Sequence, residues 1–156
     1  MAKKPDADNS VCRNRKATFQ FAILEKLECG IVLHGAEVKS LRAGNVSLNE
    51  AYARIDGNEL YLIGFHIGQY AFDTSPDRES RRRLKLLAHS REIHKLRVKV
   101  EQKGLTLVPL RVYFNSRGIA KVEVAVARGK SAGDKRQGMK DREHKREMDR
   151  YARRRR

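Results

Sequence analysis

Alternating hydrophobic and polar residues near the N-terminal end of the chain predict its first strand. Residues 17–27 (ATFQFAILEKL) show the period of two expected of a half-buried strand. Residues 28–30 (ECG) interrupt this pattern, and residues 31–33 (IVL) predict that the strand resumes. The alternating positions are Phe19, Phe21 and Ile23.

Two pairs of later strands are each joined by a short, glycine-containing turn. The predicted pairs are 50–55 with 59–67, and 105–114 with 119–127. The first turn, Asp56-Gly-Asn58, suits a tight hairpin because Asp-Gly readily adopts positive φ angles. The second strand of the first pair would present one face made of Tyr61, Ile63, Phe65 and Ile67. The last strand would turn inward its Val122, Val124 and Val126.

Two segments show helical spacing instead. Residues 35–44 place Val38 and Leu41 on one face, with Gly44 as a C-terminal stop. Residues 90–103 are followed by the stop Gly104. Their apolar residues recur three and four apart, at Ile93, Leu96 and Val100. Residues 69–83 predict a polar loop.

Five or six short antiparallel strands with two or three short helices predict a mainly β fold. A small antiparallel, OB-fold-like barrel is the commonest object of this kind, and a sandwich is the alternative. We expect this folded domain to span residues 14–128, after a flexible N-terminal arm at 1–13. Residues 129–156 form a basic C-terminal tail.

The tail holds twelve Lys and Arg residues against five Asp and Glu. So polar a segment should be disordered alone, because it has no wide apolar face to bury. Its later part lacks Gly and Pro, however, and favourably ordered ion pairs at Asp141/Lys145 and Asp149/Arg153 would support a helix on an RNA surface. Such a helix would carry one basic stripe of Arg142, Arg146, Arg150 and Arg154. Beside this stripe would lie Met148, Tyr151 and Ala152.

The charge of the whole chain indicates a polyanionic partner. Its 156 residues carry a formal net charge of +16, and RNA phosphates are the partner that releases most counterions on binding. An anionic membrane is the other candidate, but no apolar run approaches a spanning length and the N-terminus does not resemble a signal peptide. We therefore expect a cytoplasmic protein.

The sequence offers no convincing catalytic or metal site. Cys12 and Cys29 form no CxxC pair and are expected to be reduced, and the five histidines show no metal-binding spacing. Residues 129–131 (GKS) end like a phosphate-binding loop, but the glycine required at 124 is Val124. We expect no enzyme activity, cofactor or metal.

Several basic groups could instead bind RNA. Asn14, Arg15 and Lys16 precede the first strand, where they would lie at the rim of the barrel. Phe19 and Phe21 could pack in the core or stack on bases. The dense basic run at 81–85 would form a groove if Lys39, Arg42 and His89 lay beside it.

Several of these segments resemble signature segments of the SmpB family of tmRNA-binding proteins. They are residues 14–17 (NRKA), 35–44 (GAEVKSLRAG), 103–110 (KGLTLVPL), 124–130 (VAVARGK) and 134–136 (DKR). The resemblance implies an OB-fold that binds the tRNA-like domain of tmRNA (SsrA RNA) and delivers it to stalled bacterial ribosomes. It further implies trans-translation, in which the nascent chain is tagged and the ribosome rescued, with the tail helical in the empty mRNA channel beyond the decoding centre.

The resemblance also implies roles for single residues. Asn14, Phe21, Glu28, Leu87 and His89 match RNA-binding positions of the family. In the tail, the positions needed for tagging are matched by Lys130, Asp134, Lys135 and Arg136. His89 and Phe19 depart from the Asn and His that some members carry, and residues 131–133 (SAG) replace a more basic or aromatic spacer.

A general single-stranded nucleic-acid binder of the cold-shock type is the rival hypothesis. Such proteins bind through clustered aromatic side chains, whereas this chain is six per cent aromatic and has no Trp. We expect a monomer that binds tmRNA and the ribosome.

Overall fold

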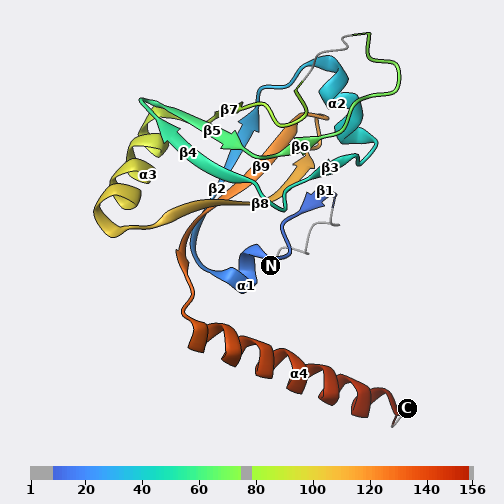
Figure 1. The fold of residues 1–156 in the computed structure, drawn as a ribbon, viewed down its shortest axis with the longest axis vertical. Helices are drawn as coiled ribbons and strands as arrows, with labels where there is room; N and C mark the ends of the chain where they lie inside the picture. The colour runs from blue at the N-terminus through green and yellow to red at the C-terminus, as the bar shows by residue number, and fades with distance from the viewer. Residues whose placement is uncertain (1–8, 75–78, 155–156) are drawn as a thin grey trace.

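The described residues of the computed structural model, 9–74 and 79–154, are mainly antiparallel β structure with four helices (Figure 1). In chain order the elements are β1 (Ser10–Arg13), α1 (Ala17–Gln20), β2 (Phe21–Ile31), α2 (Gly35–Arg42), β3 (Val46–Ser47), β4 (Tyr52–Asp56), β5 (Glu59–Ile63), β6 (His66–Ile67), β7 (Leu84–Leu87), α3 (Ser90–Lys103), β8 (Thr106–Phe114), β9 (Ala120–Gly129) and α4 (Ala132–Arg154). None of the described helices is both long enough and apolar enough to cross a membrane.

The large sheet closes on itself. Its strand order is β1-β8-β4-β5-β7-β2-β9, and a further pairing of β8 with β9 completes a ring. The contact between β4 and β8 is the narrowest join, a single registered pair at Ala53 and Leu107. The prediction of a mainly β, antiparallel fold is confirmed, and the ring explains why so short a chain can bury a core.

The core fills the inside of this ring. Leucines and valines from β5, β7 and β9 are almost fully buried, namely Leu60, Leu62, Leu84, Leu86, Val122 and Val124. The helices α2 and α3 lie at opposite ends of the sheet, and each follows the predicted span closely (Figure 1). Gly44 and Gly104 have φ angles of 76° and 59°, as expected of residues that end these helices.

The predicted face of the second hairpin strand is wrong in part. The buried residues of β5 are Leu60 and Leu62, whereas Tyr61 and Ile63 point outward. Gly64 has a φ angle of 76° and breaks the alternation, so that Phe65 and Ile67 beyond it are again buried. The prediction continued a strict period of two across Gly64, and it therefore placed Tyr61 and Ile63 on the same face as Phe65 and Ile67.

The beginning of the body also differs from the prediction. Residues 17–20 form the short helix α1, not a strand, and β2 then runs without a break through residues 28–30 to Ile31. Gly30 lies opposite Leu87 of β7, and a side chain at position 30 would lie 3.2 Å from the Leu87 Cβ. Gly30 therefore allows β7 to pair closely with β2, and it does not interrupt the strand as the sequence suggested.

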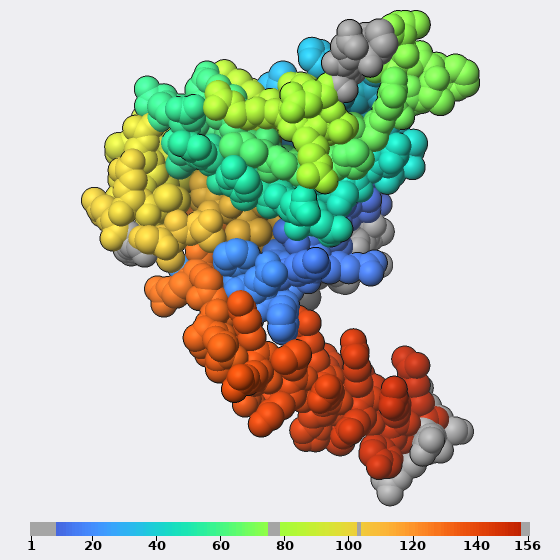
Figure 2. Space-filling model, in the orientation of Figure 1, coloured from blue at the N-terminus to red at the C-terminus, as the bar shows by residue number. Residues whose placement is uncertain are grey.

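Both flanking segments contain regular secondary structure in their described residues. Ser10–Arg13, part of the expected flexible arm, forms β1 against β8, while residues 1–8 lie outside the described residues. The tail forms the helix α4 over Ala132–Arg154, which projects away from the body (Figures 1 and 2). The glycines at its start do not prevent the helix, because Ser131 caps it and α1 supports its first turns. Beyond Arg142, the described side chains are all exposed.

Candidate nucleic-acid interface

Of the three residues at the rim of the body, Asn14 has a structural role, whereas Arg15 and Lys16 are exposed. The Asn14 side chain donates to the Pro109 carbonyl at 3.2 Å and accepts from the Ala17 backbone N–H at 3.2 Å. It therefore fixes the start of α1 on β8. Arg15 and Lys16 are exposed on the turn that follows.

A shallow groove of about 410 Å³ runs beside this turn. Four cationic side chains line it, and one carboxylate, Glu123, lies among them. The cations are Arg13, Arg15, Lys26 and Arg111. Glu123 is shared between Arg111 at 3.3 Å and Lys26 at 3.9 Å, which leaves the groove with a net positive charge. Its cations come from segments far apart in sequence, so residue spacing could not have revealed it.

Glu28 lies on the outer face of β2, where two neighbours hold its carboxylate. The Tyr113 hydroxyl donates to it, and Lys121 Nζ lies at 3.9 Å. Burial and this hydrogen bond raise the pKa of Tyr113, so its hydroxyl stays protonated at neutral pH. Tyr113, absent from the sequence-based candidates, orients a carboxylate that can accept hydrogen bonds from RNA.

Leu87 lies on the same face of the sheet as Glu28, and His89 follows Leu87 in the chain. Leu87 pairs with Gly30, two residues along β2 from Glu28, and 53% of its surface is exposed. His89 precedes α3, where its backbone N–H donates to the Glu92 carboxylate at 3.0 Å. This leaves an exposed imidazole at the start of α3. The strand register thus relates Leu87 to Glu28, and His89 is exposed two residues further along the chain.

Phe21 and Phe19 have different surroundings. Phe21 is half-buried and packs against a small cluster of Ala17, Val108 and Ala127. This packing favours a core role for most of its ring. Phe19 lies on α1, where the Arg142 guanidinium sits 5.5 Å from the centre of its ring.

The basic run at 81–85 does not form the expected groove. Each of its four cations lies beside a carboxylate of another segment: Arg81 with Glu50, Arg82 with Glu37, Arg83 with Asp56, and Lys85 with Glu59. The four N···O distances are between 2.5 and 3.0 Å. These charges fasten the segment to α2, β4 and β5, so fewer of them remain available to phosphates.

Lys39 and Arg42 lie on α2, away from His89 at the other end of the sheet. Their cations lie over aromatic rings, Lys39 over Tyr70 at 5.2 Å and Arg42 over Phe114 at 4.8 Å. Both side chains are exposed. They form a basic site separate from the groove beside Arg15 and from Glu28.

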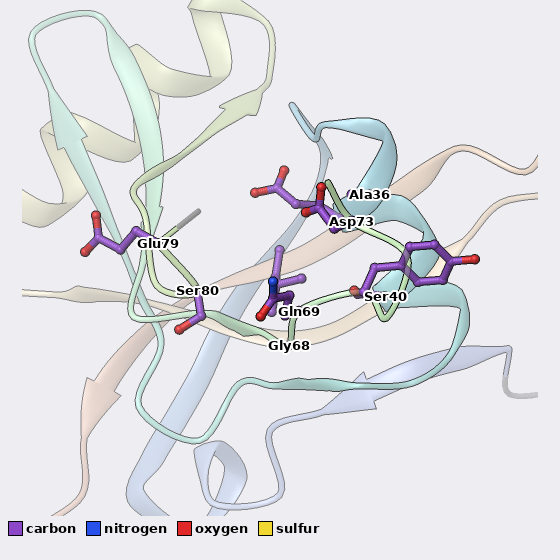
Figure 3. Close-up of a pocket in the computed structure, with 10 residues that line it drawn as sticks. Ala36, Ser40, Gly68, Gln69, Asp73, Glu79 and Ser80 are labelled. Carbon is purple, nitrogen blue, oxygen red and sulfur yellow. The ribbon is translucent and has the colours of Figure 1, made fainter. Parts of the chain in front are cut away.

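Close to α2 lies a small polar pocket, drawn in Figure 3. Helix α2 supplies Ala36 and Ser40, and the loop after β6 supplies Gly68, Gln69 and Asp73. Its volume of about 30 Å³ is enough for a water molecule or two. Within the described residues, no group of three or more His, Cys, Asp and Glu side chains could hold a metal ion.

The tail is attached to the body through α1. The Lys130 backbone N–H and side-chain Nζ donate to the carbonyls of Gln20 and Thr18, both at 2.9 Å. Lys130 thereby closes the C-terminal end of α1.

Ser131 and Asp134 then cap α4. The Asp134 N–H donates to Ser131 Oγ at 3.2 Å, and the Ser131 N–H donates back to the Asp134 carboxylate at 3.2 Å. The hydrogen bond from the Ser131 hydroxyl lowers the pKa of Asp134.

Lys135 is partly covered, whereas Arg136, Arg146, Met148 and Arg150 are exposed. Sequence reasoning missed the link from Arg142 to Phe19 and the capping role of Ser131, although its spacing to Asp134 was a readable signal.

Comparison with known proteins supports one family. The family model described as "SmpB protein" matches residues 11–154. The chain is 46% identical over 148 residues to an SsrA-binding protein of Chelativorans sp. (strain BNC1), covering 95% of each chain. It is 48% identical to that of Symbiobacterium thermophilum, covering 98% of this chain and 97% of the relative.

A solved chain shares the fold as well. It comes from a structure described as "tmRNA-SmpB: a journey to the center of the bacterial ribosome". It has 51% sequence identity and a TM-score of 0.64, and the match covers 77% of this chain and 84% of that chain.

Proposed function

The chain belongs to the SmpB protein family, and from this premise we propose that it binds the tRNA-like domain of tmRNA and delivers it to stalled ribosomes for trans-translation. The observation that supports the proposal is that the strand register places Leu87 on the same outer face as Glu28, with His89 exposed two residues after Leu87. Glu28 is far in sequence from Leu87 and His89, and together they would supply an acceptor, an apolar contact and a ring that can donate. RNA in a folded shape is recognised through such mixed contacts together with phosphate neutralisation.

We further propose a division of labour along the chain. Residues 14–128 would bind the RNA through Asn14, Arg15, Lys16 and Phe21 at the rim, and through Lys39 and Arg42 on α2. The tail would act on the ribosome, reading the empty mRNA channel with its arginine stripe. We expect most of it to be unfolded in the free protein and helical on the ribosome, because its described residues beyond Arg142 have no packing surface.

The family is one of RNA-binding proteins, and we expect no catalytic turnover from the chain itself. A factor that meets ribosomes and tmRNA would work in the cytoplasm, without a membrane partner, as the sequence predicts. We also expect it to act as a monomer.

A gel shift at physiological salt tests the RNA-binding step. A folded tRNA-like RNA should bind far more tightly than an unstructured RNA of equal length, and equal affinities would contradict the proposal. Leu87→Ala should weaken the complex with the folded RNA. Leu24→Ala is the matched control, because both leucines are 53% exposed on strands of the same sheet.

Truncation tests the division of labour. Ending the chain after Lys130 keeps the hydrogen bonds that close α1 and removes only the cap and helix of the tail. This variant should bind tmRNA as the full chain does and should fail to support tagging on stalled ribosomes. Loss of tmRNA binding itself would show that the two roles are not separable in this way.

A further inference from the structure

Two aromatic side chains, the exposed Phe72 and the half-buried Tyr70, lie together on the loop between β6 and β7. Phe72 is 82% exposed, more than any other large hydrophobic side chain among the described residues. Its ring packs edge to face against Tyr70, with the ring centres 5.6 Å apart and an angle of 61° between their planes. Lys39 of α2 reaches the same pair, with its Nζ 5.2 Å from the centre of the Tyr70 ring. Leaving so much apolar surface in water is unfavourable unless a partner covers it.

The backbone holds this aromatic pair in place. The Asp73 N–H donates to the Tyr70 carbonyl at 2.9 Å, which closes a tight turn. The Gly68 N–H donates to the Asn45 carbonyl at 2.8 Å, and this attaches the loop to the end of α2. A side chain at position 68 would meet the Asn45 side-chain amide, which would then have to move. The rings are therefore presented before a partner arrives, which reduces the entropy lost on binding.

We propose that Tyr70, Phe72 and Lys39 form a second contact for the structured RNA, in which the rings stack on an unpaired base and the ammonium meets the adjoining phosphate. This inference rests on the proposed function and names a contact that lies outside the residues the family resemblance selected. Aromatic faces stack on bases of any sequence, and a neighbouring cation matches the phosphate that accompanies every base. An apolar protein partner would gain nothing from the cation beside the ring.

The position of the turn favours the tRNA-like RNA over the ribosome as the source of the base. The turn stands beside α2 at one end of the body, and α4 leaves from the other end (Figures 1 and 2). If the tail enters the ribosome, the α2 end faces away from it. The same end carries Arg42, a further cation for an RNA backbone.

Substitution of Phe72 tests this contact. Phe72→Ala should weaken binding of the folded tRNA-like RNA by about 5- to 150-fold, the usual range for loss of one stacked base. Phe72→Trp should retain the affinity, because it keeps a stacking face. Tyr52→Ala is the matched control: Tyr52 is a 47% exposed aromatic residue on β4, outside the proposed contacts, and its loss should leave affinity unchanged.

Salt dependence separates the two parts of the contact. Stacking carries no charge, so Phe72→Ala should keep the slope of log affinity against log salt. Lys39→Gln should reduce that slope by about one phosphate contact. The unfolding midpoint of each variant, read by circular dichroism, should match that of the parent because these side chains are exposed.

Two results would overturn the inference. In the first, Phe72→Ala binds the folded RNA like the parent. In the second, it binds that RNA normally and loses affinity only for ribosomes, which would assign the aromatic pair to a ribosomal surface. Failure of the unsubstituted protein to bind the folded RNA would instead refute the proposed function, so the two failures are distinguishable.

Discussion

The ion pair between Glu37 and Arg82 offers the sharpest test of how α2 is held on the body. The Glu37 carboxylate lies 2.6 Å from Arg82 Nε and 2.7 Å from its Nη2, and it also accepts from the His34 backbone N–H at 2.7 Å. Glu37 is 3% exposed, whereas 27% of the Arg82 side chain reaches solvent. We expect Glu37→Ala to destabilise the fold strongly, because a partly buried guanidinium would lose its partner.

The size of the effect follows from this burial. Removing one member of a fully buried ion pair costs about 3–5 kcal/mol. Arg82 can recover part of that cost by turning toward water, which lowers the figure to about 2 kcal/mol. Loss of the hydrogen bond to the His34 N–H at the start of α2 adds about 1 kcal/mol. The free energy of unfolding should therefore fall by about 3 kcal/mol in Glu37→Ala, and by less in Glu37→Gln, whose amide keeps one acceptor.

The pair should also make stability depend on pH in a defined direction. Burial raises the pKa of the Glu37 carboxyl, but hydrogen bonds from Arg82 and from the His34 backbone outweigh it and leave the pKa below its ordinary value of 4.5. A lowered pKa in the folded state stabilises the protein above the unfolded value and is lost as pH falls through the folded value. The stability difference between the parent and Glu37→Gln should thus be full at pH 7 and shrink below about pH 4.5.

Urea unfolding followed by circular dichroism measures both quantities. A double-mutant cycle with Arg82→Met, which retains much of the apolar stem, isolates the coupling between the two side chains. A coupling of about 2 kcal/mol is expected. If Glu37→Ala lost less than about 0.5 kcal/mol at pH 7, or if the cycle gave no coupling, the pair would not anchor α2 and the reasoning from its geometry would be wrong.

Three further predictions concern the core, the thiols and the tail cap. Leu62→Ala should lower the unfolding free energy by about 2–5 kcal/mol in the same urea assay, since Leu62 is fully buried in the ring; a loss under 1 kcal/mol would argue against a tightly packed interior. Burial raises the pKa of Cys29 to about 12, so a thiol reagent should modify the half-buried Cys12 first and Cys29 only after unfolding; equal rates would contradict this. Ser131→Ala should lower the helix content that a peptide of residues 129–156 reaches in trifluoroethanol, measured by circular dichroism at 222 nm. The cap contributed by Asp134 should weaken as pH falls through its lowered pKa, and unchanged helicity would exclude the cap.

Local signals in the sequence predicted the hairpins and the two inner helices correctly. Gly57 and Gly118 adopt φ angles of 61° and 74° in their turns, which is a property of a few adjacent residues. Helices α2 and α3 likewise depend on spacing and on a C-terminal glycine. These elements were predictable because their physical causes lie within a short stretch of chain.

Elements fixed by distant contacts were not predictable in the same way. Helix α1 begins where the Asn14 side chain bonds to Pro109, 95 residues away. Its C-terminal end is held by Lys130, which donates to the Thr18 carbonyl, 112 residues away. The run at 81–85 suggested a possible RNA groove because the carboxylates that pair with it come from other segments and could not be assigned to it from the sequence. Glu28 and Leu87 were selected by family resemblance, and only the strand register explains why they share a face.

The arrangement of ion pairs gives the division of the chain a physical basis. Among the described residues, several cations of the body form ion pairs with carboxylates of the body, whereas none of the α4 cations whose side chains are described does so. A phosphate approaching one of these paired cations must compete with a carboxylate that is already in place, so the body will bind where shape and specific contacts help. A phosphate approaching α4 meets cations that no carboxylate holds in an ion pair. A selective body joined to a strongly attracting tail suits a protein that must choose one RNA and then bind a much larger RNA surface.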